Sequence, residues 1–108
     1  MCGIAGFFTG ACDEGAARAA LTRMTDALVH RGPDASGSWV DASRGIALGH
    51  RRLSIVDLSP HGQQPMVSTS GRFWLVFNGE IYNYRALRES LHAQGALFRG
   101  HSDTEVLV

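Results

Sequence analysis

The chain has 108 residues, so its length allows one domain at most. A hydrophobic content of 44% is enough for a folded core and argues against disorder. Ten arginines balance ten acidic residues, and this neutral charge gives no sign of binding to nucleic acid or to an anionic membrane.

Residue type and spacing also argue against a membrane-spanning, a secreted or a metal-binding protein. No apolar run approaches the roughly 18 residues of a membrane span, and the apolar start lacks the basic flank of a signal peptide. Five histidines and two cysteines, Cys2 and Cys12, are not spaced as metal ligands, so we expect no metal site. Two cysteines do not make a disulfide framework, and we therefore expect a protein of the reducing cytoplasm.

The first predicted elements are a buried strand, a helix and two short strands around a turn. Their ranges are Gly3–Phe8, a helix from Asp13 or Glu14 to about Val29, and strands Ser38–Asp41 and Ile46–Arg51 around Ala42–Gly45. In the helix, the apolar spacing i, i+3, i+7 predicts one buried face, made of Leu21, Met24 and Leu28.

The later elements also mix the two types of secondary structure. An apolar-rich segment and a loop come first, then a strand of β-favouring residues and a helix, over Leu53–Leu58, Ser59–Gln64, Arg72–Asn78 and Asn83–Gln94. We expect Asn83 to cap this helix, Leu87 and Leu91 to point inward, and Gly95 to end it. The elements together predict an α+β fold.

The run Ser102–Glu105 has the form of a capping box, with Ser at the cap and Glu three residues later. It predicts the start of a helix, yet only one turn follows it. Isolated helices need roughly 12–15 residues to be even marginally stable. We therefore expect residues 1–108 to be the front part of a longer protein.

Cys2 is the strongest candidate for chemistry. Removal of Met1 would make Cys2 the N-terminus, and its small side chain favours that removal. A terminal Cys carries a nucleophile and a base on one residue, because its thiol attacks while its free α-amine takes the proton. The alternative is that Cys2 is a small apolar residue at the start of a strand.

Five motifs resemble one family in the same order. With the opening Met-Cys-Gly-Ile, they are His30–Asp34, Gly49–Asp57, Asn78–Asn83 and Ser102–Val106. The set resembles the class II glutamine amidotransferases, which are N-terminal-nucleophile hydrolases, and within them the glutamine-hydrolysing asparagine synthetases. The resemblance implies two stacked antiparallel sheets between helical layers, a four-layer αββα sandwich of which this chain holds about the first half.

The resemblance also implies roles for single residues. Cys2 would attack the side-chain amide of glutamine, while the Asn78 amide and the Gly79 N–H would stabilise the oxyanion. Arg52 would bind the carboxylate of glutamine and Asp103 its ammonium group. The remaining substrate contacts would be Leu53, Ser54, Ile55, Val56 and Glu80.

The family passes its ammonia to a C-terminal synthetase domain, which uses ATP and Mg²⁺ to amidate aspartate. The phosphate-binding loop of that domain is not found in this sequence. We therefore expect no cofactor in this chain. The expected partners are glutamine, the absent synthetase domain and, in the full-length protein, a second copy, with neither nucleic acid nor membrane among them.

Alternative interpretations stay open at this point. Arg52 and its neighbour Arg51 could be surface residues, Asp103 a first-turn helix acid, and Asn78-Gly79 a type I′ hairpin turn. A Cys–His pair with His30 or His50 is a second possible mechanism. The chain could also be a truncated or split non-catalytic remnant, or the glutaminase half of an enzyme that amidates another carboxylate. We expect the isolated chain to be inactive.

Overall fold

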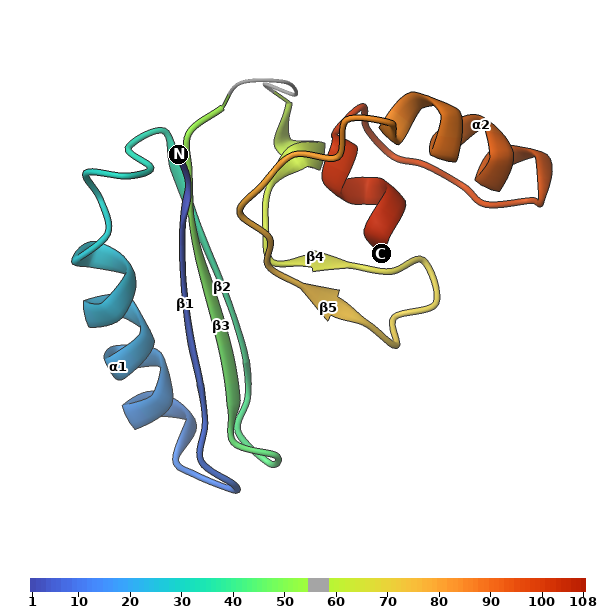
Figure 1. Ribbon diagram of the computed structural model, residues 1–108. Coiled ribbons are helices and arrows are strands. Elements are labelled where there is room, and N and C mark those ends of the chain that lie inside the picture. Colours follow the sequence, from blue (N-terminus) through green and yellow to red (C-terminus); the bar gives the residue numbers. More distant parts are fainter. Residues whose placement is uncertain (55–58) are drawn as a thin grey trace.

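The computed structural model describes residues 1–54 and 59–108 (Figure 1). The described elements are strands and helices β1 (Gly3–Phe8), α1 (Glu14–Asp26), β2 (Ala35–Asp41), β3 (Ile46–Arg52), β4 (Met66–Val67), β5 (Trp74–Leu75) and α2 (Tyr84–Ala93), with 3₁₀ helices at Pro60–Gly62 and Asp103–Leu107. The α+β prediction is confirmed, since two antiparallel sheets combine with these helices. None of the described helices is long and apolar enough to cross a bilayer.

The first sheet has the strand order β1-β3-β2, and both pairings are antiparallel. Side chains alternate across a strand, so one face of β3 turns toward α1 and the other away from it. A Cβ at Gly49 would lie 2.4 Å from Thr25 and 3.0 Å from Leu21, both on α1. Gly49 therefore faces α1. His50 and Arg52, one and three positions further along β3, lie on the opposite face of the sheet.

Helix α1 begins as the sequence predicts, because the Asp13 carboxylate accepts a hydrogen bond from the Ala16 N–H at 2.8 Å. The helix ends at Asp26, and hydrogen-bonded turns follow it. Its buried face differs in part from the prediction. Leu21 is buried, but Met24 is 37% exposed, and the other buried residues are Ala17 and Thr25.

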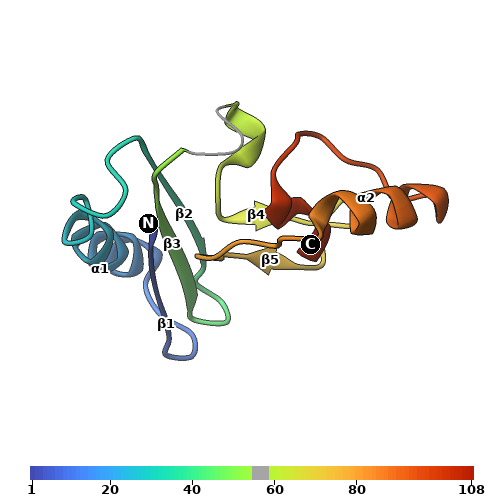
Figure 2. The ribbon, with the colours of Figure 1, turned by 45° about the horizontal axis from the view of Figure 1, so that its top comes forward.

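The second sheet is small and lies on the side of the first sheet opposite α1 (Figures 1 and 2). It pairs β4 with β5 through Met66–Leu75 and Val67–Trp74. The predicted strand Arg72–Asn78 is thus confirmed only at its centre. Beyond β5 the Phe77 N–H donates to the side chain of Gln64, so a side chain replaces a strand as its partner.

The two sheets meet through an aromatic pair. Trp39 on β2 stacks on Trp74 on β5, with ring centroids 4.8 Å apart and planes 20° from parallel. Offset stacking of this kind adds about 0.5–1.5 kcal/mol to the burial of the rings. A second close approach lies at Gly37, where a Cβ would come within 1.9 Å of the Gln64 carbonyl oxygen. The sequence therefore needs glycine at this crossing.

Helix α2 is close to its predicted range, but its details differ. Asn83 stands at the N-cap without a side-chain capping bond, and Leu87 is 38% exposed rather than turned inward. Gly95, at φ +94°, follows the helix, and its N–H donates to His92. The prediction that Gly95 ends the helix is therefore confirmed.

The expected capping box does not form. Residues Asp103–Leu107 make a 3₁₀ helix, and the Ser102 side chain makes no capping bond. The Glu105 carboxylate turns to the preceding loop, where it accepts hydrogen bonds from the Arg99 and Gly100 N–H groups. Arg88 of α2 lies 3.9 Å from the same carboxylate. Glu105 thus joins α2, the loop and the 3₁₀ helix.

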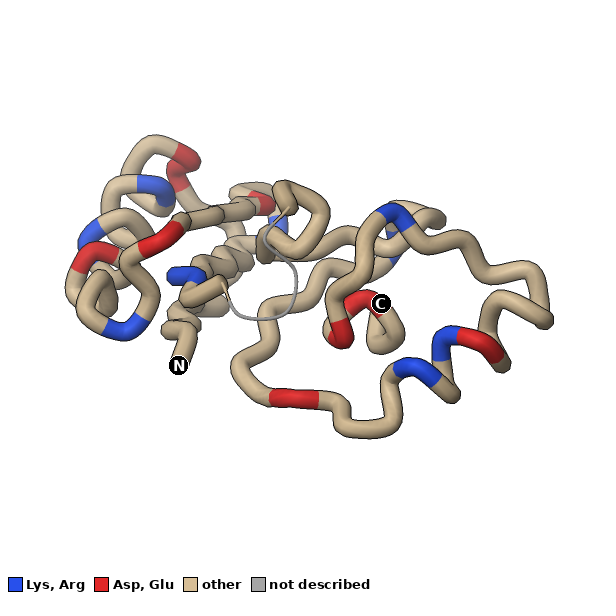
Figure 3. The backbone as a smooth tube through the Cα atoms, turned by 90° about the horizontal axis from the view of Figure 1, so that it is seen from above, with Lys and Arg blue, Asp and Glu red and all other residues tan. Residues whose placement is uncertain are grey.

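Acidic and basic residues are interspersed along the described chain (Figure 3). Two of the four ion pairs among the described residues are local, as between Glu14 and Arg18 one helical turn apart. Arg51 is an exception, because its guanidinium lies 3.8 Å from Asp26 on α1 and its side chain is only 15% exposed. The interpretation of Arg51 as a surface residue is therefore wrong.

Candidate functional site

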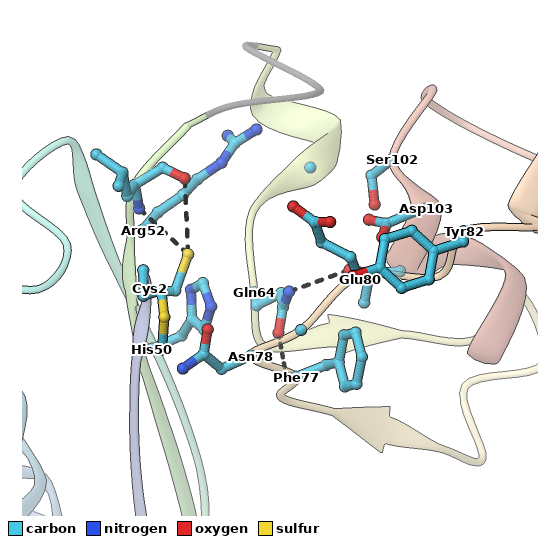
Figure 4. A pocket seen from close by; sticks show the side chains of 15 residues that line it. Cys2, His50, Arg52, Gln64, Phe77, Asn78, Glu80, Tyr82, Ser102 and Asp103 are labelled. Atoms are coloured by element: carbon cyan, nitrogen blue, oxygen red, sulfur yellow. Dashed lines mark hydrogen bonds between the residues drawn. The ribbon is translucent and has the colours of Figure 1, made fainter.

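A cavity of about 330 Å³ opens between the first sheet and the later part of the chain (Figure 4). Segments far apart in sequence line it: the N-terminus, the end of β3, the stretch that follows β5 and the start of the last 3₁₀ helix. The lining residues are Met1, Cys2, His50, Arg52, Leu53, Gly62, Gln64, Phe77, Asn78, Gly79, Glu80, Tyr82, Ser102, Asp103 and Thr104.

Cys2 lies at the entrance to β1, beside the end of β3. The Leu53 N–H donates to the Cys2 sulfur at 3.3 Å, and the thiol lies 3.6 Å from the Leu53 carbonyl oxygen. Arg31 donates from Nε to the Cys2 carbonyl oxygen at 3.3 Å. The thiol is free. As long as Met1 precedes it, the Cys2 nitrogen is an amide, which cannot act as a base.

Arg52 lies at the end of β3 and is only 7% exposed. The interpretation of Arg52 as a surface residue is therefore wrong. Its Nη1 donates to the Ser59 carbonyl oxygen at 2.8 Å. A guanidinium has five N–H donors in a planar fork, which suits a carboxylate ligand.

Of the two described residues that follow Arg52, one lines the cavity and the other does not. Leu53 lines the cavity. Ser54 is not among the lining residues, and its N–H donates to the Asp34 carboxylate at 2.8 Å. Ile55 and Val56, predicted as substrate contacts, lie outside the described residues.

Asn78 and Gly79 line the cavity after β5. Neither has a positive φ, so the type I′ turn interpretation is wrong. The reason for glycine at position 79 is space. A Cβ there would lie 2.7 Å from the Phe77 ring.

Two carboxylates face the cavity from the side opposite Cys2 and Arg52 (Figure 4). The Asp103 Oδ2 accepts a hydrogen bond from the Ile81 N–H at 2.7 Å, which fixes the segment after Gly79 to the last 3₁₀ helix. Glu80 belongs to that fixed segment. The cavity therefore offers a buried cation on one side and two carboxylates on the other.

His50 is a lining residue that the sequence analysis did not assign as a substrate contact. It is 1% exposed, and neither ring nitrogen has a hydrogen-bond partner among the described residues. Burial lowers the pKa of its imidazole, the backbone of Phe77 opposes this shift, and the charge of Arg52 adds to it. The signal that could have found His50 is its position two residues before Arg52 on one strand, which gives both the same face.

Gln64 is a second residue of the site that sequence reasoning missed. Its Oε1 accepts a hydrogen bond from the Phe77 N–H at 2.5 Å, and its Nε2 lies 3.4 Å from the Thr104 hydroxyl. One amide thus joins the segment before Asn78 to the helix that carries Asp103. The site's remaining unpredicted lining residues are Met1, Gly62, Phe77, Tyr82, Ser102 and Thr104.

The alternative Cys–His mechanism receives no support from the geometry. His30 is exposed and is not a lining residue. Within residues 1–54 and 59–108, the Cys2 sulfur has hydrogen-bond contacts to the backbone of Leu53 and none to His50. The same described residues contain no group of three His, Cys, Asp or Glu that could hold a metal ion.

Comparison with known proteins shows the family of the chain. Residues 1–108 match the model of the glutamine amidotransferase domain. Asparagine synthetase [glutamine-hydrolyzing] 1 of Bacillus subtilis is 47% identical over 82% of this chain and 13% of its own length. A putative asparagine synthetase [glutamine-hydrolyzing] of Mycobacterium tuberculosis is 44% identical over the whole chain and 18% of its own length. Amidase chry2 of Gibberella zeae is 38% identical over the whole chain and 17% of its own length.

The chain thus spans less than a fifth of the length of these relatives. The match to the domain nevertheless covers every residue, from the Cys2 side of the cavity to the Asp103 side. The chain therefore belongs to the glutamine amidotransferase domain family and is similar over its whole length to glutamine-hydrolysing asparagine synthetases.

Proposed function

We propose that this chain is the glutaminase part of an asparagine synthetase-like enzyme. It hydrolyses glutamine to glutamate and ammonia through a thioester on Cys2. One observation carries the proposal: a single cavity combines the Cys2 thiol, the buried Arg52 cation, the Asn78-Gly79 pair and the Asp103 carboxylate.

Charge complementarity supports the substrate. Free glutamine has a carboxylate, an ammonium group and a neutral side-chain amide. Arg52 binds the carboxylate through its guanidinium fork, and Asp103 binds the ammonium group, with Glu80 as a further contact. Leu53, Ser54, Ile55 and Val56 belong to the same proposed substrate pocket.

The reaction begins when removal of Met1 frees the α-amine of Cys2. The amine takes the thiol proton, and the sulfur attacks the side-chain amide carbon of glutamine. The Asn78 amide and the Gly79 N–H donate to the oxyanion, and each such donor is worth roughly 2.7–4 kcal/mol of barrier. The amine returns the proton to the leaving nitrogen as the carbon–nitrogen bond breaks, which releases ammonia. Water then hydrolyses the thioester, giving glutamate and the free thiol.

We propose the N-terminal-nucleophile hydrolase fold for the complete domain, a four-layer αββα sandwich whose first part is residues 1–108. The position of β4 and β5 beyond the face of the first sheet opposite α1 supports it. In the complete enzyme, the ammonia goes to a C-terminal synthetase domain where ATP and Mg²⁺ support amidation of aspartate. We further propose a cytoplasmic homodimer, with no cofactor held by the present chain.

We propose as the alternative that the glutaminase part serves an enzyme that amidates a carboxylate other than aspartate. The match of Amidase chry2 over the whole chain is consistent with this, since that relative is not named an asparagine synthetase. The residues of the cavity recognise glutamine in both cases, so the acceptor depends on the synthetase domain.

The test uses an extended protein, defined as residues 1–108 followed by the residues that complete Bacillus subtilis asparagine synthetase 1. The natural relative is the positive control, and Cys2→Ser is the matched negative control. We expect one glutamate for each glutamine consumed, and a thioester mass adduct on Cys2 after rapid acid quenching. Full glutaminase activity in Cys2→Ser would contradict the proposal.

A further inference from the structure

His50 is the most deeply buried polar side chain of the cavity. It is 1% exposed, and neither ring nitrogen makes a hydrogen bond of normal geometry in the described part of the chain, although the Phe77 backbone lies close enough to interact with the ring. A buried polar group without a partner costs roughly 1–3 kcal/mol, so proteins seldom keep one without a use. No step of the proposed reaction uses His50.

Asn78 lines the same cavity and, unlike His50, is exposed. Within residues 1–54 and 59–108, no hydrogen bond holds its amide. Figure 4 shows the His50 ring on the same side of the cavity as Cys2 and Arg52, with the amide oxygen of Asn78 pointing toward that ring. The backbone of the preceding residue, Phe77, also lies close enough to act on the imidazole.

The orientation of the Asn78 amide matters for its proposed role. An asparagine amide has an N–H₂ end that donates and an oxygen end that accepts. Only the N–H₂ end stabilises an oxyanion, whereas the oxygen end would repel it. Rotation by half a turn exchanges the two ends, so an efficient oxyanion site needs a group that selects one of them.

We propose that His50 is a positioning residue that orients the Asn78 amide by donating a ring N–H to its oxygen. The inference rests on the proposed glutaminase function and assigns His50 a part in it. The bond leaves the N–H₂ end of Asn78 free for the oxyanion. Burial favours a neutral ring, which still keeps one N–H donor.

A double-mutant cycle in the extended protein tests this pairing. His50→Leu replaces the ring with an apolar side chain and removes its donor. We expect a kcat about 10- to 100-fold lower, since misorientation loses most of what one oxyanion donor supplies, and a KM within about two-fold. His50→Gln, which restores an N–H donor, recovers most of kcat. His92→Leu, on the exposed side of α2, is the matched control and leaves kcat unchanged.

The decisive comparison introduces His50→Leu into a protein that already carries Asn78→Ala. If His50 acts through Asn78, then His50→Leu/Asn78→Ala has the kcat of Asn78→Ala alone, within about two-fold. Multiplicative losses would overturn the proposal, because His50 would then act on Cys2, on glutamine or on the fold. An unmodified extended protein without glutaminase activity would instead contradict the proposed function.

A spectroscopic measurement gives a result that does not depend on activity. In the extended protein labelled with ¹⁵N-histidine, we expect a slowly exchanging ring N–H for His50. Its resonance moves in Asn78→Ala and stays in place in the control His92→Leu. A ring N–H resonance that Asn78→Ala leaves unchanged would overturn the pairing even if the protein hydrolyses glutamine.

Discussion

The backbone N–H of Leu53 donates to the sulfur of Cys2 at 3.3 Å, across 51 positions of sequence. This contact joins the start of β1 to the chain just beyond β3. The same contact also fixes the direction in which the sulfur faces the cavity.

The first prediction concerns the N-terminus of the extended protein. With Met1 retained, or with the amine of Cys2 acetylated, we expect glutaminase activity to be nearly absent. The nitrogen of Cys2 is then an amide, and the nearest amine lies one residue away, roughly 3.8 Å between Cα atoms. Intact-mass analysis of each sample, combined with glutamate release, makes the comparison. Equal rates with a free and a blocked N-terminus would show that another group is the base.

The second prediction concerns the two charged ends of glutamine. Arg52→Ala and Asp103→Ala should each raise KM roughly 10- to 150-fold, because a charged hydrogen bond is worth about 1.5–3 kcal/mol. Arg44→Ala is the matched control, since its side chain is 78% exposed and pairs only locally with Asp41. Steady-state kinetics with glutamine provide the measurement. A KM of Arg52→Ala equal to that of the control would remove Arg52 from the substrate site.

The third prediction separates binding from transition-state stabilisation. Asn78→Ala should lower kcat about 10²- to 10³-fold with little change in KM, because its donor acts on charge that develops only during reaction. Progress curves over a range of glutamine concentrations give both constants. A rise in KM at unchanged kcat would assign Asn78 to ground-state binding and reject its oxyanion role.

The fourth prediction concerns the crossing of the two sheets. Gly37→Ala should destabilise the extended protein and lower its melting temperature, because the new Cβ would meet the Gln64 carbonyl oxygen at 1.9 Å. Gly15→Ala is the matched control in α1, where the nearest atom is the Asp13 carboxylate oxygen at 3.3 Å. Alanine there should be neutral or stabilise by up to about 1 kcal/mol. Equal melting temperatures for the two variants would mean that the backbone at Gln64 can move to accommodate the added Cβ without loss of stability.

The fifth prediction concerns residues 1–108 without any extension. Only four apolar residues are buried among those described, Ala17, Leu21, Ala47 and Met66, whereas Phe8, Phe73 and Leu97 are more than half exposed. Exposed apolar side chains and a two-residue sheet edge favour association. We expect an associated or poorly folded sample without glutaminase activity. A sharp thermal transition from a monomeric sample would contradict this and make the chain a self-sufficient domain.

Local sequence signals were sufficient for elements that depend on neighbouring residues. The bounds of β1, the start of α1 at Asp13–Glu14 and the Gly95 stop after α2 all form as predicted. Each depends on backbone conformation or on a hydrogen bond within a few residues, which the sequence alone specifies. The expectation that β1 is a buried strand is wrong, because Ile4 is 47% and Phe8 76% exposed. The charged and nucleophilic candidates Cys2, Arg52 and Asp103 were likewise found from sequence motifs, and all three line one cavity.

Tertiary structure decided the features that depend on distant partners. The strand predicted over Arg72–Asn78 ends early because Gln64 takes the Phe77 N–H, and the Glu105 carboxylate binds the Arg99–Gly100 backbone rather than capping Ser102. Each bond competes with a local one that propensity favours, and packing selects between them. The buried position of His50 follows from the pairing of β3 with both β1 and β2. Sequence therefore determined which chemical groups the chain carries, while the meeting of the two sheets determined which of them share a cavity.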